Sequence, residues 1–100
     1  MYELNGNVVL SGFNDVGYAD VSVVKELVSS HAQKLSERQP FSTLALHLKT
    51  VHKTSEESGK YEIRAKLDTN KCVLYANTVE HNIFAAVDAI MTKIQNQIKA

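Results

Sequence analysis

Histidine and cysteine are the residues of this sequence that could bind a metal ion or attack a substrate. His47 and His52 are five positions apart on one predicted strand, so their side chains point to opposite faces and cannot share a metal ion. His31 lies on the apolar side of a predicted helix, where we expect it at the edge of the core. His81 has no cysteine and no pair of carboxylates close to it in sequence. The spacing therefore predicts no zinc site.

A nucleophilic or phosphate-binding site has equally little support. Cys72, the only cysteine, stands between a predicted turn and an apolar pair, and we expect it to be buried and structural. Gly12 and Gly17 are too far apart for a phosphate-binding loop, and no Lys-Ser or Lys-Thr pair stands next to them. The two glutamates of the 54–59 loop are expected to be solvated. We therefore expect no catalysis, no cofactor and no small-molecule substrate.

The basic residues of the predicted helices are more informative. At 100° per residue, Lys34 and Arg38 lie along one flank of the apolar stripe of the first helix, and Lys25 lies along the other. Lys93 lies at the edge of the stripe of the second helix. If the two helices lie side by side, Lys34, Arg38 and Lys93 line the groove between them. The alternative is that these side chains are ordinary solubilising charge at the border of the core.

A second basic set alternates along two predicted strands. His47 and Lys49 lie on the polar side of one strand, and Arg64 and Lys66 lie on the polar side of the next. On an open sheet these residues make a basic patch. One alternative is a charged face that keeps the sheet from aggregating. Another is a homo-oligomer formed through the same face, with apolar contacts from Ala45, Val51 and Tyr75.

Hydrophobic periodicity predicts the elements that must position these residues. The segment Leu4–Phe13 is predicted as a first strand with an irregular start at Gly6-Asn7. Apolar residues at helical spacing predict a helix over Asp20–Glu37. We expect the Asp20 side chain to cap this helix and Pro40 to end it.

Three more strands and a second helix follow. Alternating apolar residues predict strands over 41–51 and 61–67, and residues 68–70 form the tight turn of a hairpin that leads into a strand over 71–77. Within that last strand, one side is expected to carry Cys72, Leu74 and Ala76 and the other Tyr75. An apolar stripe over Ile83–Ile98 predicts a helix that opens at Thr78 or Glu80.

The order β-α-β-β-β-α, with one apolar face on each element, predicts an α+β fold. We expect a two-layer sandwich in which a four-stranded, mainly antiparallel sheet is covered on one face by both helices. The direction of the edge pairing stays open. The prediction requires Leu46 and Ile63 to lie on the face of the sheet that meets Ile90. Residues 1–100 are expected to form a single domain.

Composition narrows the class of protein without identifying it. The chain has 100 residues, of which 44% are hydrophobic and 22% charged, and 11 basic and 11 acidic residues give a formal net charge of zero. A strongly basic nucleic-acid clamp is therefore excluded, and any basic surface must be local. No apolar run is long enough to span a membrane, and the N-terminal segment lacks the features of a signal peptide. With its single cysteine, the chain is expected to be a soluble cytoplasmic protein with no membrane partner.

Three segments carry a resemblance to a known family: 61–67 (YEIRAKL), 74–76 (LYA) and 82–99 (NIFAAVDAIMTKIQNQIK). The hibernation-promoting factor family comprises small ribosome-associated inhibitors of stalled or stationary cells. Its members show a strand that ends in Leu-x-Ala, then a helix with an aromatic-Ala-Ala-Ile-Asp core followed by Lys-Leu-x-x-Gln-Leu. Here Phe84–Asp88 resembles the first part of that helix and Lys93–Ile98 resembles the second.

Other positions agree with the family or depart from it. Lys34-Leu35 is similar to the family pattern near the end of the first helix. Asn96 stands where the family usually has arginine, and Gln95 stands where an acid is common. These departures indicate a diverged member with a weakened basic surface.

The resemblance implies a double-stranded-RNA-binding-domain-like fold and binding to the small ribosomal subunit near the messenger and transfer-RNA path. The implied function is hibernation-type inhibition of translation by occupancy of structured ribosomal RNA. Apart from the resemblance, a weak homodimer formed through the open sheet face is the other partner that we consider. Lys34, Lys93 and Lys99 match basic positions of the family. Lys25 and Arg38 are added to the expected RNA-binding set by the helix geometry alone.

Overall fold

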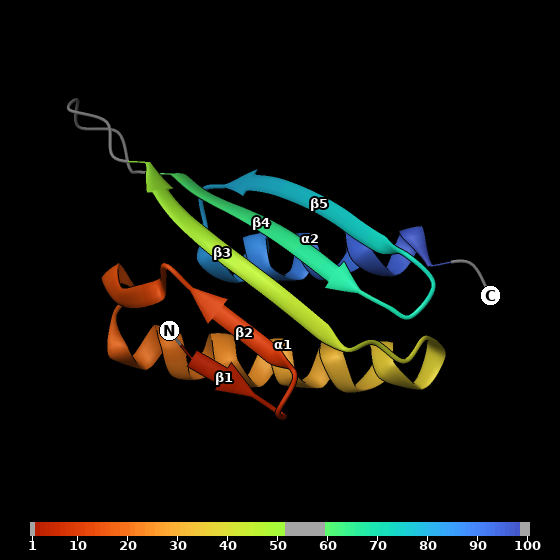
Figure 1. Cartoon of the computed structure of the whole chain (residues 1–100). Coiled ribbons are helices and arrows are strands. Elements are labelled where there is room, and N and C mark those ends of the chain that lie inside the picture. The colour runs from red at the N-terminus through yellow and green to blue at the C-terminus, as the bar shows by residue number, and fades with distance from the viewer. Residues whose placement is uncertain (1, 52–59, 99–100) are drawn as a thin grey trace.

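The computed structural model describes residues 2–51 and 60–98, and within them it contains five strands and two long helices (Figure 1). The strands are β1 (Tyr2–Leu4), β2 (Val8–Ser11), β3 (Thr43–Val51), β4 (Lys60–Asp68) and β5 (Val73–Glu80). The helices are α1 (Tyr18–Arg38) and α2 (Ile83–Gln97), and a 3-10 turn, η1 (Phe13–Asp15), precedes α1. The predictions made for His52, the 54–59 loop and Lys99 lie outside the described residues.

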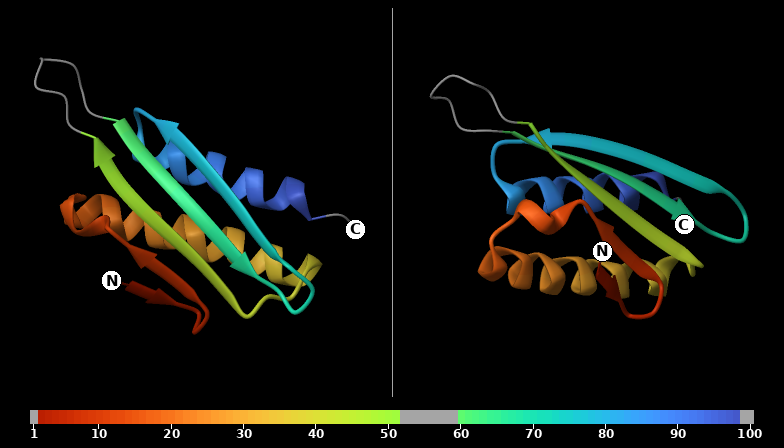
Figure 2. Two further views of the ribbon diagram at one scale, coloured as in Figure 1. Left: turned by 45° about the horizontal axis from the view of Figure 1, so that its top comes forward. Right: turned by 60° about the vertical axis from the view of Figure 1, so that its left-hand side comes forward.

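The strands form one sheet in the order β1-β2-β3-β4-β5. β2 and β3 are parallel because α1 carries the chain back between them, and all other neighbouring strands are antiparallel. Figure 2 shows both helices on the same side of this sheet. The α+β class, the mainly antiparallel sheet and the position of the helices are therefore confirmed. The strand number differs, since the sequence predicts four strands and the described residues form five.

The additional strand arises in the N-terminal segment, where the sequence predicts one continuous strand. Asn5 and Gly6 have φ angles of 55° and 80°, and the Asn7 amide donates a hydrogen bond to the Leu4 carbonyl at 3.2 Å. Positive φ at both central residues is the pattern of a type I′ turn, for which Asn-Gly is a preferred pair. The chain reverses at this turn, so that Tyr2–Leu4 pairs with the strand that follows.

The N-terminal end of α1 differs from its prediction. The helix begins at Tyr18, and Gly17 occupies the N-cap position without any side-chain cap bond. Asp20 lies in the first turn rather than at the cap, so the predicted cap is wrong, although an acid in this turn still complements the helix dipole. The C-terminal end agrees with its prediction, because α1 stops at Arg38 and the extended Gln39 precedes Pro40.

The start of α2 also differs from its prediction. Thr78 and Glu80 belong to β5, and the helix begins at Ile83. The Asn82 side-chain oxygen accepts hydrogen bonds from the amides of Phe84 at 2.8 Å and Ala85 at 3.0 Å. Asn82 is therefore the residue that caps α2 and ends the strand-to-helix connection.

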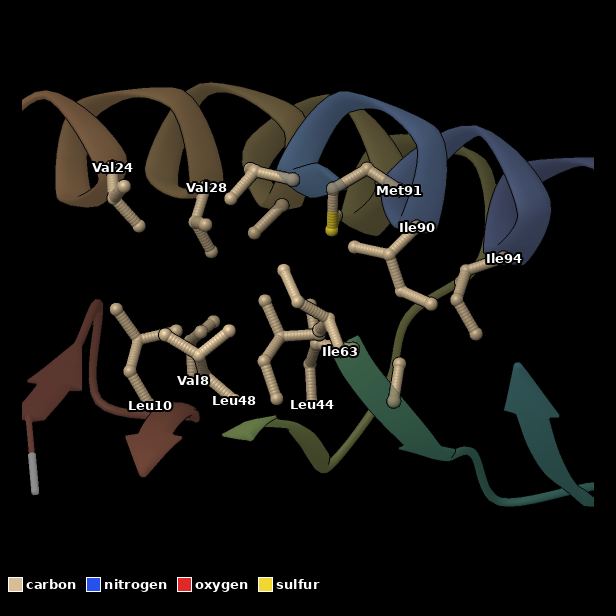
Figure 3. Close-up of a cluster of buried hydrophobic side chains, with 14 of the residues drawn as sticks. Val8, Leu10, Val24, Val28, Leu44, Leu48, Ile63, Ile90, Met91 and Ile94 are labelled. Atoms are coloured by element: carbon tan, nitrogen blue, oxygen red, sulfur yellow. The ribbon is translucent and has the colours of Figure 1, made fainter. Parts of the chain in front are cut away.

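One hydrophobic core lies between the inner face of the sheet and the helices. Leu46, Ile63 and Ile90 are fully buried in the same cluster, which confirms the predicted facing of sheet and helix. Figure 3 shows Ile90 and Ile94 of α2 and Val24 of α1 pointing toward the strand side chains. Each fully buried aliphatic side chain of this kind stabilises the fold by roughly 1.5–3 kcal/mol.

The turn between β4 and β5 corrects the prediction for Cys72. This cysteine is exposed, not buried, because it belongs to the turn and precedes the strand. The Thr69 hydroxyl oxygen accepts hydrogen bonds from the amides of Lys71 at 3.1 Å and Cys72 at 2.9 Å, which closes the turn. Beyond the turn, Leu74 is half-buried on the inner face and Tyr75 is exposed on the outer face, as predicted.

Candidate functional site

Lys34 and Arg38 lie on the flank of α1 that faces α2. His31, which lies about 60° from Lys34 and about 20° from Arg38 around the helix, has its Nε2 atom 3.2 Å from Oδ1 of Asp88 on α2. Both Lys34 and Arg38 are exposed. No carboxylate of the described residues lies within 4.0 Å of either cation. The flank therefore presents two unpaired cations beside the line where the helices meet.

Lys93 does not lie in the groove between the helices, so its predicted place beside Lys34 and Arg38 is wrong. Its ammonium donates a hydrogen bond to the Asn77 carbonyl on β5 at 2.8 Å. Asp88 and Lys93 are five residues apart and so point about 140° away from each other around α2. Because the Asp88 flank faces α1, the Lys93 flank faces the edge strand.

Gln97 repeats this contact one helical turn later. Its Nε2 atom donates a hydrogen bond to the Tyr75 carbonyl at 2.7 Å. Two alternate residues of the edge strand therefore have their outward carbonyls satisfied by side chains of α2. The i, i+4 spacing of Lys93 and Gln97 is visible in the sequence and places both side chains on one flank of the helix. That this flank faces the edge strand follows only from the position of β5 in the structure.

The remaining members of the predicted helical set are separate from Lys34 and Arg38. The half-buried Lys25 places its ammonium 4.2 Å from the centre of the Tyr2 ring, a cation–π contact that ties α1 to β1. Lys99 lies outside the described residues. The predicted RNA-binding set is thus divided between two flanks of α1 and the β5 edge of α2.

The second predicted basic set does come together on the outer face of the sheet. The strand register places His47 beside Arg64, and Arg64 beside Asn77. In the neighbouring rows Lys49 lies beside Glu62 and Lys66 lies beside Tyr75. The four predicted residues therefore form one surface, which we call the sheet patch: His47, Lys49, Arg64 and Lys66.

Arg64 and Lys66 of the sheet patch have carboxylate partners, unlike Lys34 and Arg38 of α1. The Arg64 Nε atom lies 3.5 Å from the Glu62 carboxylate, and the Lys66 ammonium lies 4.0 Å from the Asp68 carboxylate. His47 Nδ1 is 2.9 Å from the Ser11 hydroxyl. Exposed ion pairs of this type contribute about 0.2–1 kcal/mol, so a phosphate can displace them at small cost.

Among the described residues we also looked for a metal-binding cluster and for a membrane-spanning helix. In 2–51 and 60–98, no three His, Cys, Asp or Glu side chains are grouped so that they could hold a metal ion. Neither helix in this part of the chain has the length and hydropathy to cross a bilayer.

Of the apolar contacts predicted for a homo-oligomer, Ala45 is half-buried and Tyr75 is exposed, while the Val51 side chain lies outside the described part.

Solved structures share this fold at low sequence identity, whereas no family model and no curated protein matches the chain in sequence. One is a ribosomal subunit interface protein from Coxiella burnetii, with a TM-score of 0.62 and 19% identity over 91% of each chain. Another is the N-terminal domain of Protein Y from Thermus thermophilus, with a TM-score of 0.59 and 13% identity over 94% of each chain. The chain therefore has, along nearly its whole length, the fold of these two proteins, as its resemblance to the hibernation-promoting factor family implies.

Proposed function

We propose that this protein associates with the ribosome by binding structured RNA of the small subunit and modulates translation by occupancy, without catalysis. The observation that carries the proposal is the likeness, over 91% of both chains, to a fold described as a ribosomal subunit interface protein. The helix motif Phe84–Asp88 supports it independently from the sequence. An activity of this kind takes place in the cytoplasm and needs neither a cofactor nor a small-molecule substrate.

The flank of α1 with Lys34 and Arg38 is the surface that we assign to RNA. Both side chains are exposed and have no carboxylate partner among the described residues, so a phosphate can bind them without first breaking an ion pair. Binding of phosphates by such cations releases counterions, which is the main source of affinity for structured RNA. Shape and phosphate contacts are sufficient for helical RNA, so base-reading side chains are not required.

Lys25 and Lys93 are assigned smaller parts in RNA binding. The Lys25 ammonium is engaged with the Tyr2 ring, and the Lys93 ammonium is engaged with the Asn77 carbonyl. Each must leave a contact within the fold before it can bind a phosphate. Lys99 remains a proposal that rests on the family pattern alone.

Sucrose-gradient sedimentation of cell extract tests the proposal. We expect the protein to travel with ribosomal subunits, with the small subunit as its carrier, and the double variant Lys34→Gln/Arg38→Gln to shift toward the top of the gradient. The matched control is Lys49→Gln/Lys60→Gln, which removes the same charge from the outer face of the sheet. If the control is the damaging pair, the RNA-binding face is the sheet. If wild-type protein stays at the top of the gradient, ribosome association is wrong and the homo-oligomer becomes the better explanation.

A further inference from the structure

The outer face of β5 carries large apolar side chains that the proposed function does not use. Val73, Tyr75 and Val79 are exposed by 42%, 65% and 53%, and they occupy alternate positions of the edge strand on the side away from both helices. A hollow beside them is lined by Arg64, Ala65, Tyr75, Ala76 and Asn77. A surface tyrosine beside an open hollow offers a flat ring to a ligand.

The edge of β5 is blocked, so the face of the strand is the part open to a partner. The outward carbonyls of Tyr75 and Asn77 already accept hydrogen bonds from Gln97 and Lys93. A peptide that adds as a sixth strand would have to displace both side chains, because strand addition uses these same carbonyls. A ligand that stacks on the face meets no such obstacle.

Two cations lie close to Tyr75 in the register of the sheet. Because the Tyr75 carbonyl points outward to Gln97, Tyr75 and Lys66 form a non-hydrogen-bonded pair, the kind in which cross-strand Cα atoms approach to about 4.5 Å. The next row along the sheet joins His47, Arg64 and Asn77. Lys66 is therefore the cross-strand neighbour of Tyr75, and Arg64, one row away, lines the same hollow as Tyr75.

We infer that the outer sheet face binds a single-stranded RNA segment, with one base stacked on Tyr75 and the adjoining phosphates held by Lys66 and Arg64. An aromatic ring on an open sheet with cations beside it is the combination that binds single-stranded nucleic acid. The Asn77 amide, one row from Tyr75, is placed to bond a base edge. This site goes beyond the proposed contact of α1 with structured RNA, and it lies on the opposite side of the molecule.

A second copy of the chain fits this face less well than RNA does. A two-fold interface places the same surface on both partners, and on this face Lys49, Arg64 and Lys66 outnumber Glu62 and Asp68, so an excess of positive charge would meet its own copy. This excess charge opposes the apolar contact of Tyr75. A polyanion neutralises the same cations.

Fluorescence anisotropy at low salt tests the inference with a labelled, unstructured oligouridine of about a dozen nucleotides, a length suited to such sites. Tyr75→Ala should weaken binding about five- to a hundredfold, which corresponds to the loss of one stacked base. Tyr75→Phe keeps the ring and should retain the affinity. Tyr18→Ala is the matched control, because Tyr18 is 93% exposed but lies at the start of α1. Tyr75→Val, which also lacks the ring, suits a strand and serves if the alanine variant is unfolded by circular dichroism.

The outcomes separate this site from ribosome association, because the probe is isolated RNA and no ribosome is present. Loss of binding in the ring-deleted variants alone supports the site. Failure of wild-type protein to bind oligouridine, or equal binding by Tyr75→Val, overturns it. A dimer in sedimentation equilibrium that Tyr75→Ala dissociates, without any RNA binding, assigns the face to a second copy and also overturns the inference.

Discussion

Lys93 on α2 donates a hydrogen bond to the Asn77 carbonyl of β5 at 2.8 Å, and this contact covers the exposed edge of the sheet. Edge strands present unpaired backbone groups that invite pairing with another chain. Together with Gln97, which reaches the Tyr75 carbonyl, Lys93 satisfies two of these groups from within the same molecule. A residue that the sequence nominates for RNA binding therefore has a structural task as well.

Removing these two donors should loosen the edge strand. We expect Lys93→Met and Gln97→Met, which keep the length of the side chain and the helix propensity, to lower the free energy of unfolding by roughly 0.5–1.5 kcal/mol each. Amide hydrogen exchange should accelerate in β5 more than in β3. Urea denaturation measures the first effect, with Lys34→Met as the control that removes a cation without a backbone contact. Equal stability of the three variants would show that the hydrogen bonds from Lys93 and Gln97 to β5 do not stabilise the fold.

If α1 contacts RNA phosphates as proposed, the affinity for the small subunit should depend on salt concentration in a defined way. Lys34→Gln/Arg38→Gln removes about two phosphate contacts, so the slope of log K against log salt for the small subunit should flatten by roughly 1.4–1.8. Affinity measured at several salt concentrations checks this, with Lys49→Gln/Lys60→Gln measured in parallel. A slope unchanged by the α1 pair contradicts the assignment of this surface, even if the protein still sediments with ribosomes.

The contact between His31 and Asp88 should couple the two helices weakly. Their side chains lie 3.2 Å apart with exposures of 24% and 70%, so a double-mutant cycle of His31→Ala and Asp88→Ala should give a coupling energy of about 0.2–1 kcal/mol. Thermal or urea unfolding supplies the four stabilities. His31→Ala with Asp20→Ala is the comparison cycle and should be additive, because Asp20 lies in the first turn of α1. A coupling of zero in the first cycle would mean that the helices are held by their apolar contacts alone.

Glycine is required at position 12 and not at position 17. Gly12 has a φ of 79°, and a Cβ atom there would overlap the Leu48 carbonyl oxygen, so Gly12→Ser should cost about 2 kcal/mol or more. Gly17 has a φ of −57°, a Cβ atom added to it would meet no heavy atom within 4 Å, and serine is a favoured N-cap residue. Gly17→Ser should therefore be neutral or stabilising in the same unfolding experiment. Similar costs at the two positions would contradict this account.

Much of the fold follows from two periodicities in the sequence. The alternation around Leu46 and Ile63 predicts which side chains of β3 and β4 face inward, because a strand has only two faces. The stripe around Ile90 predicts the buried side of α2 for the corresponding reason. Both are long patterns, and in both the burial of apolar area decides the structure.

The predictions fail where the structure depends on a short sequence motif or on which element packs beside a residue. Asn5-Gly6 is a strong hairpin signal, but a three-residue strand before it has too few positions to show alternation. Thr78 suits both a strand and a helix cap, and Asn82, four residues later, makes the actual cap. A helical wheel places Lys93 on a flank of α2, but it contains no information about whether that flank meets α1 or the edge of β5. Only the arrangement of the sheet supplies that answer.

The parallel pairing of β2 with β3 has a consequence for the order of folding. Val8 pairs with Leu44 across 36 residues of chain, whereas β4 and β5 are joined by a short turn. Because closing a longer loop costs more entropy before any contact repays it, we expect the β4–β5 hairpin with α2 to form the folding nucleus and the N-terminal hairpin to dock after the transition state. Kinetic φ values should then be higher for Leu67→Ala than for Val8→Ala, and the reverse order would place the nucleus at the crossover through α1. Substitutions in β2 would on this account act mainly on the unfolding rate, so the lifetime of the folded state depends on the strand that joins last.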